Sequence, residues 1–237
     1  MPISDMSLML HLDEGQGWGS TPGTELEDSS HQGNKVEIAG TDSLTWAVLD
    51  EKHPWADDVM FGDSALIFNS GKKAYVKVDD KDVLNPTSIT MEVWIKLKGN
   101  PDCDGNNNWR YIITKGWNQY HLILEENRQI SASFYVNGVL RRLRSTTQIP
   151  LNEYTFIAAT YDNETGVGRL IINERVEKEE HWPPGNIAST SNELRIGNDV
   201  SGCPNGGGIP DAAIDEVRIY NRALSSKEII MHYQGLY

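Results

Sequence analysis

The segment Ser88-Ile89-Thr90-Met91-Glu92-Val93-Trp94-Ile95-Lys96-Leu97-Lys98 decides the fold class of this 237-residue chain. Every second residue from Ile89 to Leu97 is apolar, and the residues between them, apart from Trp94, are polar. Side chains of a β-strand point alternately to the two faces of a sheet, so this pattern is typical of a half-buried strand. We therefore predict a strand here, with one buried and one solvated face.

Segments with the same period of two lie on both sides of it. The spacing predicts further strands at residues 6–12, 65–68, 74–78, 111–115, 120–125, 129–136, 139–144, 154–161, 168–172, 193–196 and 213–220. Polar turns separate them, and Asn137-Gly138 favours a tight hairpin. No helical pattern lies between the strands, which argues against βαβ units. The predicted fold class is all-β, with two antiparallel sheets packed as a jelly-roll sandwich.

One short helix is predicted near the C-terminal end of the sequence. Ser225-Ser226-Lys227-Glu228 has the spacing of a capping box, and the apolar Ile229, Ile230 and Tyr233 follow it. We expect this helix to plug one end of the sandwich. Long loops are expected at residues 15–35, 41–62, 99–110 and 198–210, where binding residues usually lie.

Composition limits the possible partners. Asp and Glu outnumber Lys and Arg by 34 to 21, so nucleic-acid backbones would be repelled. The mean hydropathy is -0.48, and no stretch approaches the ~20 apolar residues of a bilayer span, so no membrane insertion is expected. The length suits one domain over residues 1–237. The first residues lack the features of a secretory signal.

The two cysteines, Cys103 and Cys203, both lie in stretches rich in Gly, Asn, Asp and Pro. Neither has a nearby Cys with the spacing of a zinc site. If the two loops meet, a disulfide would close about 100 residues and stabilise the fold by about 4 to 5 kcal/mol. Two free thiols are the alternative, and the sequence leaves both open.

A family resemblance emerges from six segments in a fixed order. They are LMLHLDEG (8–15), DSSHQGN (28–34), GDSALIF (62–68), ITMEVWIK (89–96), YTFIAATYD (154–162) and IDEVRIYNRAL (214–224). With them the chain resembles the laminin G-like, concanavalin A-like jelly rolls, especially the bacterial and viral type that is often appended to glycan-active proteins. The segment 41–62 and the loop around Cys103 depart from that pattern as insertions.

The resemblance implies a structural calcium ion that ties the N-terminal loop to the last strand. The matching residues are Asp28, Asn34 and Asp215. Calcium takes six to eight oxygen ligands from carboxylates, amides and carbonyls, which these residues can supply. The alternative is that Asp28 caps a turn and Asp215 pairs with an Arg.

Carboxylate pairs for glycoside hydrolysis are poorly supported. Glucanases of this fold place both carboxylates on alternate residues of one strand, whereas the candidate strand offers Glu92 alone. Asp215 and Glu216 are adjacent, so on a regular strand they point to opposite faces. Glu177 and Glu179 have the alternate spacing but lie in a charged run, which favours a hydrated strand end.

A lyase site would use other side chains. His121 beside Tyr120, with Arg141 and Arg144 on a following strand, is the arrangement to examine. Cross-strand packing is the favoured interpretation of these residues. No HExxH or GxSxG motif occurs in the chain.

Aromatic residues on polar loops suit sugar binding, because sugar C–H faces stack on Trp and Tyr rings while hydroxyls bond to polar side chains. The predicted ligand contacts are Asn107, Asn108, Trp109, Trp117 and Tyr120. Trp55 and Trp182 are alternatives on other loops. Packing at a sheet edge is the alternative role for any single Trp.

The sequence therefore predicts a non-catalytic glycan-binding module, with a structural calcium ion, that is secreted or displayed on a cell or virion surface. The main alternative is a structural or adhesive surface protein, such as a virion decoration or appendage domain, whose partner is another surface protein. A polysaccharide lyase or glycoside hydrolase is the third.

Overall fold

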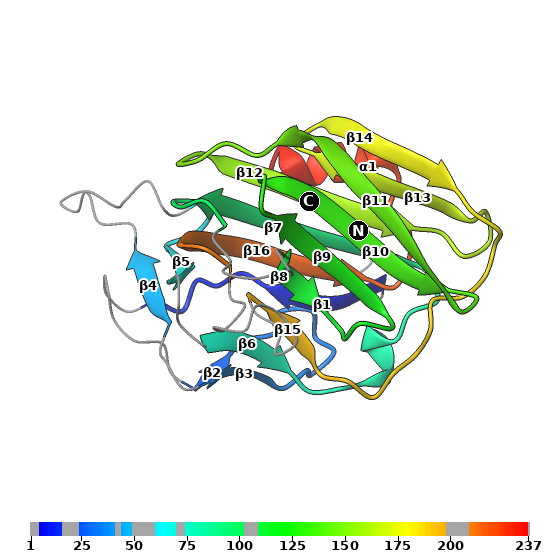
Figure 1. Cartoon of the computed structure of the whole chain (residues 1–237). Helices are drawn as coiled ribbons and strands as arrows, with labels where there is room; N and C mark the ends of the chain where they lie inside the picture. Colours follow the sequence, from blue (N-terminus) through cyan, green and yellow to red (C-terminus); the bar gives the residue numbers. More distant parts are fainter. Residues whose placement is uncertain are drawn as a thin grey trace.

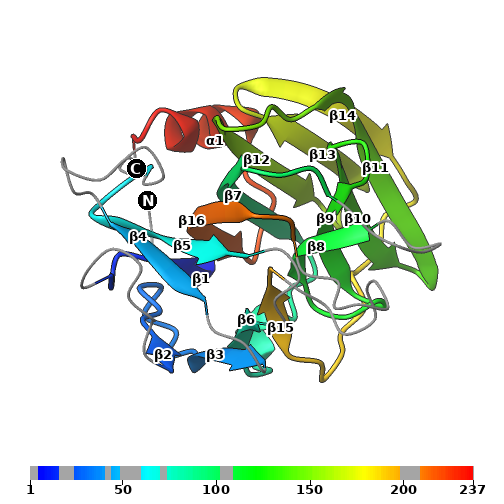
Figure 2. The same cartoon turned by 60° about the vertical axis from the view of Figure 1, so that its left-hand side comes forward.

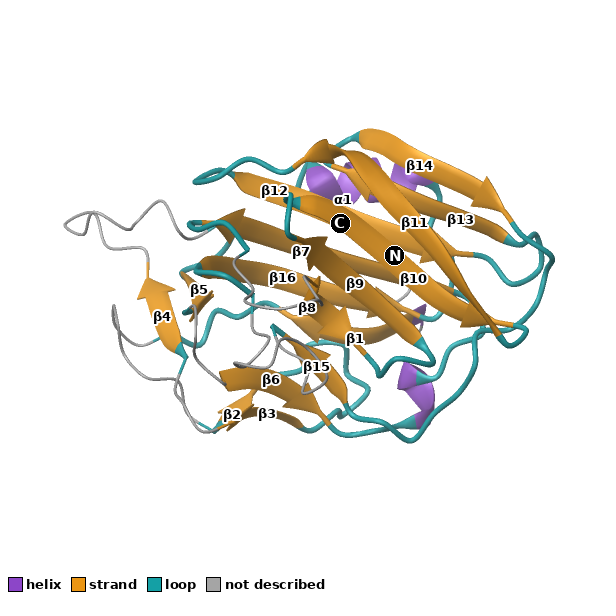
Figure 3. Ribbon diagram, viewed as in Figure 1, coloured by secondary structure: helices purple, strands orange, loops and turns teal. Residues whose placement is uncertain are grey.

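Two antiparallel sheets of eight strands each lie face to face in the computed structural model (Figures 1 and 3). The structure describes residues 5–15, 24–40, 44–48, 60–69, 74–101, 109–197 and 209–236. The predicted all-β jelly-roll sandwich is confirmed.

The first sheet has the strand order β14-β13-β12-β7-β16-β5-β4, and β1 also pairs with β16. Its strands are β1 (Met6–Leu10), β4 (Thr45–Val48), β5 (Ser64–Phe68), β7 (Ile89–Leu97), β12 (Tyr154–Tyr161), β13 (Val167–Ile172), β14 (Arg175–His181) and β16 (Ala212–Tyr220).

The second sheet has the order β11-β10-β9-β8-β15-β6-β3-β2. Its strands are β2 (Glu25–Leu26), β3 (Val36–Gly40), β6 (Ala74–Val78), β8 (Trp109–Thr114), β9 (Tyr120–Glu125), β10 (Gln129–Val136), β11 (Val139–Gln148) and β15 (Leu194–Ile196). A short 3-10 helix, η3 (Asp82–Leu84), follows β6, and the helix α1 (Ser226–Tyr233) follows β16.

The main core lies between the two sheets. Ile89, Met91, Val93, Ile95 and Leu97 of β7 all belong to it, as the period of two predicts. From the second sheet, alternate residues of β9 and β10 point inward and meet them. The residues between these inward positions are left on the outer face of each sheet.

The outer face of the first sheet is not solvated at β7, which corrects the prediction for this strand. All nine residues of β7 are buried, because α1 covers this face instead of plugging one end of the sandwich (Figure 2). The rings of Trp94 and Tyr233 are stacked with centroids 5.5 Å apart. Ile229 of α1 packs into the same second core.

Predicted and observed strands agree where the alternation is strong. The bounds of β6, β9, β10 and β12 match the prediction, whereas β2, β3, β4 and β14 were not predicted as strands. β2 and β4 lie within segments predicted as loops. Edge strands such as β2, β4 and β14 have one bonded neighbour in their sheet and need little apolar patterning, so alternation reveals them poorly.

In the described part of the chain, no helix has the length and apolar character needed to cross a membrane. The prediction of one domain over residues 1–237 stays a prediction.

Candidate functional site

An aromatic and charged surface lies on the outer face of the second sheet, over β8 to β11. Tyr120, Leu122 and Leu124 of β9 point into the core, so His121 and Glu125 point outward. The register places Glu125 opposite Trp109 of β8. These neighbours, with the turn after β8 and two arginines of β11, form what we call the Trp109 surface. It comprises Trp109, Trp117, His121, Glu125, Arg142 and Arg144.

Two of the predicted ligand contacts meet at this surface. The rings of Trp109 and Trp117 are stacked, with centroids 5.4 Å apart and planes 14° apart. The ring of Trp117 also stacks on the buried His121 at 5.7 Å. Trp117 is nevertheless 45% exposed, so this ring presents apolar surface to solvent.

Glu125 holds two arginines beside the rings. Its Oε1 lies 2.6 Å from Nη2 of Arg142, and its Oε2 lies 2.6 Å from Nη2 of Arg144. Ser131 also donates a hydrogen bond to Oε1. The Arg142 guanidinium lies over the Trp109 ring, with Cζ 4.7 Å from the centroid. One carboxylate therefore fixes both cations, and one of them also packs against the indole.

A hollow of about 420 Å³ lies next to these side chains. It is lined by Trp109, Glu125, Glu126, Asn127 and Arg144. This lining combines one aromatic ring with carboxylate, amide and guanidinium groups, which suits a polar ligand that also has an apolar face.

The other predicted ligand contacts have different outcomes. Asn107 and Asn108 lie outside the described residues, as do Trp55, Cys103 and Cys203.

Tyr120 is completely buried and its hydroxyl donates to the backbone oxygen of Leu84, 3.0 Å away. Its ring therefore has no surface for a ligand in this structure. Trp182 packs against the main core as a partly buried residue.

The alternate carboxylates of β14 are held as surface groups. Burial raises the pKa of Glu177, but hydrogen bonds from Thr147 and Thr146 outweigh it and leave the pKa below its ordinary value. A hydrogen bond from Arg169, with a smaller contribution from His181, lowers the pKa of Glu179. A general acid needs a raised pKa, so this pair is poorly suited to acid catalysis.

The proposed lyase arrangement is also packed rather than open. His121 is almost completely buried between Trp117 and Tyr111, whose ring meets its imidazole edge to face at 5.7 Å. Arg144 is bound to Glu125. These contacts match the cross-strand packing expected as the alternative.

The structure brings together two of the three predicted calcium ligands. Oδ2 of Asp28 accepts hydrogen bonds from the backbone and side-chain nitrogens of Asn34, and Oδ1 accepts from the backbone of Met9 and Ser30. Oδ1 of Asn34 and Oγ of Ser7 are buried and have no hydrogen-bond partner among the described residues. The hydrogen bonds of Asp28 match the turn cap expected as the alternative, and the two partnerless oxygens are of the kind that calcium prefers.

Asp215 lies at a different place. Its Oδ2 accepts hydrogen bonds from the backbone of Met60 and Phe61, at 3.1 and 3.0 Å. No hydrogen bond in the described residues joins it to Asp28 or Asn34. Burial raises its pKa to about 8, and the negative charges of Glu216 and Asp13 add to the effect against the two backbone donors.

In a regular strand, Glu216 and Asp215 would point to opposite faces, but here they do not. Its φ is 51°, and the pairing of β16 with β7 shifts register between Asp215 and Arg218. This bulge leaves Glu216 on the outer side, where it binds His11 and Arg218.

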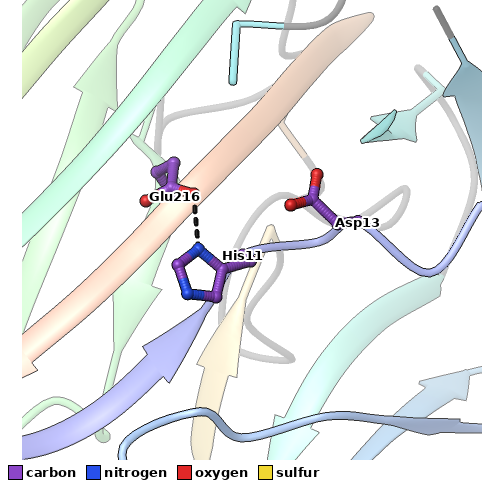
Figure 4. Close-up of side chains that lie close together, drawn as sticks. All are labelled: His11, Asp13 and Glu216. Carbon is purple, nitrogen blue, oxygen red and sulfur yellow. Dashed lines mark hydrogen bonds and ion pairs between the residues drawn. The ribbon is translucent and has the colours of Figure 1, made fainter. Parts of the chain in front are cut away.

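His11, Asp13 and Glu216 form a cluster that the sequence did not reveal (Figure 4). Nδ1 of His11 lies 2.7 Å from Oε1 of Glu216, and ligand atoms of all three lie within 4.8 Å of one another. His11 and Asp13 both belong to the family-like segment 8–15, which was the available signal. The bulge that presents Glu216 to them leaves no sequence pattern.

Comparison with known families gives a match to the model described as the concanavalin A-like lectin/glucanases superfamily, over residues 70–230. No curated protein matches the chain by sequence.

Solved structures share the fold. The binding domain of Paraclostridial Mosquitocidal Protein 1 matches with a TM-score of 0.70 and 13% identity, over 98% of this chain and 52% of that one. A structure of botulinum neurotoxin type C matches with a TM-score of 0.65 and 16% identity, over 99% of this chain and 52% of that one. The cell entry of that toxin depends on interaction with two ganglioside molecules. The binding domain of botulinum neurotoxin DC with rat synaptotagmin II matches with a TM-score of 0.65 and 15% identity, over 100% and 53%. This chain spans about half the length of these chains.

Proposed function

Since the chain belongs to the concanavalin A-like lectin/glucanase superfamily, we propose that it is a non-catalytic glycan-binding module whose ligand docks at the Trp109 surface. Two of the structurally similar toxin structures are of binding domains, one of them in complex with a protein, and the third is of a neurotoxin whose cell entry depends on gangliosides. At 13 to 16% identity, the likeness to these structures shows the fold alone. The case for the ligand therefore rests on this chain's own residues.

The observation that carries the proposal is the stacked pair Trp109 and Trp117 beside the hollow. The Trp117 indole is 45% exposed, so its apolar surface is available to the C–H groups of a sugar ring. Glu125, Glu126, Asn127 and Arg144 around the hollow supply donors and acceptors for sugar hydroxyls. The rigid sheet beneath fixes these groups before the ligand arrives, which lowers the entropic cost of binding.

Charge favours a neutral glycan. The carboxylates of Glu125 and Glu126 balance the guanidiniums of Arg142 and Arg144, and both arginines are already bound to Glu125. The chain as a whole carries a net charge of -13, which repels polyanions.

A glycan array probed with the full chain tests the proposal. We expect binding to neutral glycans that falls by about 30-fold in Trp117→Ala, since a central aromatic contact is typically worth about 2 kcal/mol. Val176→Ala on β14, another exposed apolar residue, is the matched control and should bind normally. A silent array would reject the function, and unchanged binding by Trp117→Ala would reject the site.

A protein partner is the second candidate. The exposed Val139 and Val176 lie on β11 and β14, the end strands of the two sheets, which contact each other. An edge strand can pair with a strand of a partner, as an adhesive or virion surface module would require. The charged side chains of β14 oppose such pairing, which is why we favour the glycan.

We also propose a structural calcium ion at Asp28 and Asn34. The buried oxygens of Asn34 and Ser7 that lack a hydrogen-bond partner support it, whereas Asp215 is engaged with the backbone of Met60 and Phe61.

A glycan ligand implies a secreted or surface-displayed protein, and we propose that location.

A further inference from the structure

We propose that His11, Asp13 and Glu216 form a second cation site, distinct from the calcium loop, that binds a borderline divalent ion of the zinc type. Figure 4 shows the three side chains arriving from the segment after β1 and from β16. Ligand atoms of all three lie within 4.8 Å of one another, so small rotations would bring them around one ion.

The backbone fixes these three residues in place. Leu12, between His11 and Asp13, has a φ of 60° and is buried in the main core. Its anchored side chain leaves those of His11 and Asp13 outside the core. Glu216 sits in its bulge at a φ of 51°, one residue beyond the pairing of Leu10 with Val217. Both segments are therefore fixed by core packing and strand pairing before any ion arrives.

A third carboxylate, that of Asp215, lies beside the cluster and is incompletely satisfied. Asp215 is fully buried, and its Oδ1 has no hydrogen-bond partner among the described residues. Its Oδ2 binds the backbone of Met60 and Phe61, while Oδ1 of Asp13 binds the backbone of Asp63, so both carboxylates clamp one turn.

Gly62 brings that turn against Asp13. A Cβ added at this glycine would lie 2.2 Å from both carboxylate oxygens of Asp13. Asp13 and Asp215 thus converge on one short turn. Glu216 is instead bound to His11 and to the Arg218 guanidinium. A divalent cation would offset the negative charge of Asp13.

The ligand atoms indicate the type of ion. One imidazole nitrogen with carboxylate oxygens suits zinc and its neighbours, whereas calcium prefers oxygen ligands alone. The His11 side chain is 43% exposed and Asp13 is exposed, so an ion can enter from solvent. On binding, the metal would replace the hydrogen-bond proton between Nδ1 of His11 and Glu216.

Isothermal titration of the full chain with zinc tests this assignment. We expect one saturable site, with an affinity at least tenfold lower in His11→Asn and in Asp13→Asn. His181→Asn is the matched control, because His181 also pairs with a carboxylate, Glu179, but lies on the surface of β14. It should bind like the unchanged protein, as should Asp28→Asn in the calcium loop.

Circular dichroism establishes that each variant is folded. If Asp13→Asn disturbs the turn that Asp13 binds, the zinc affinity of His11→Asn decides the test. The absence of a saturable zinc site overturns the proposal. An unchanged zinc affinity in His11→Asn also overturns it, because the zinc would then be bound elsewhere, for example by the cysteine thiols. Displacement of zinc by calcium at equal concentration overturns it as well.

Discussion

Nδ1 of His232 lies 2.9 Å from Oε2 of Glu92, which joins α1 to β7 across 140 residues of sequence. Both side chains are buried, and Arg218 lies 3.7 Å from the same carboxylate oxygen. This contact, with the stacking of Tyr233 on Trp94, holds the helix against the outer face of the first sheet.

Replacing Glu92 by Leu should lower the free energy of unfolding by about 3 to 5 kcal/mol, because it removes the carboxylate between two buried basic groups. Urea unfolding followed by circular dichroism measures the change. Glu180→Leu on the exposed strand β14 is the control and should change stability by less than about 0.5 kcal/mol. A Glu92→Leu variant as stable as the unchanged chain would show that packing alone holds α1.

Asp215 should make stability depend on pH in a defined direction. Burial raises its pKa to about 8, so between pH 4 and pH 8 the folded state holds a proton that the unfolded state has lost. Stability attributable to this group therefore decreases as pH rises through that window. Asp215→Asn removes the effect, so its stability relative to the unchanged chain should increase from pH 4 to pH 8 in metal-free buffer. A difference that does not vary with pH would contradict the assignment.

Glu125→Gln should change the charge preference of the Trp109 surface. It removes the carboxylate that neutralises Arg142 and Arg144, so the hollow becomes positive. We expect retention on a heparin column at low salt, lost at high salt, where the unchanged protein flows through. Glu126→Gln alters the net charge equally but keeps the contacts of Glu125, and it should not be retained. Equal retention of both variants would mean that overall charge decides.

Calcium should raise the melting temperature through the loop of Asp28. Ligand at a hundred times its dissociation constant stabilises by about 2.7 kcal/mol, and chelation should reverse the shift. Asp28→Asn should abolish the shift, whereas Asp13→Asn should keep it, because Asp13 belongs to the other cluster. A calcium shift that persists in Asp28→Asn would place the ion elsewhere.

The sequence predicted the parts of the fold and site that depend on local pattern. Alternation identified β7, and the Ser225 to Glu228 spacing identified the start of α1, where both hydrogen bonds of the capping box are present. Trp109 and Trp117 could be selected because each lies next to asparagines in a stretch predicted as a loop or turn. Their stacking was not predictable from that pattern.

The remaining features depend on contacts distant in sequence. Glu125 meets Arg142 because β9, β10 and β11 pair in one register, and a single sequence does not specify register. Glu216 joins His11 because a bulge reverses its expected face. The docking of α1 was mispredicted because an amphipathic helix can bury its apolar face at an end or over a sheet.

The central claim is that a glycan docks at the Trp109 surface, and the indole N–H signals of the tryptophans test it most directly. Titration of the isotope-labelled chain with a neutral oligosaccharide selected from the array should shift the signals of Trp109 and Trp117. The signals of Trp94, buried under α1, and Trp182 should stay in place. Shifts confined to other tryptophans, with Trp109 and Trp117 unmoved at saturation, would contradict the account.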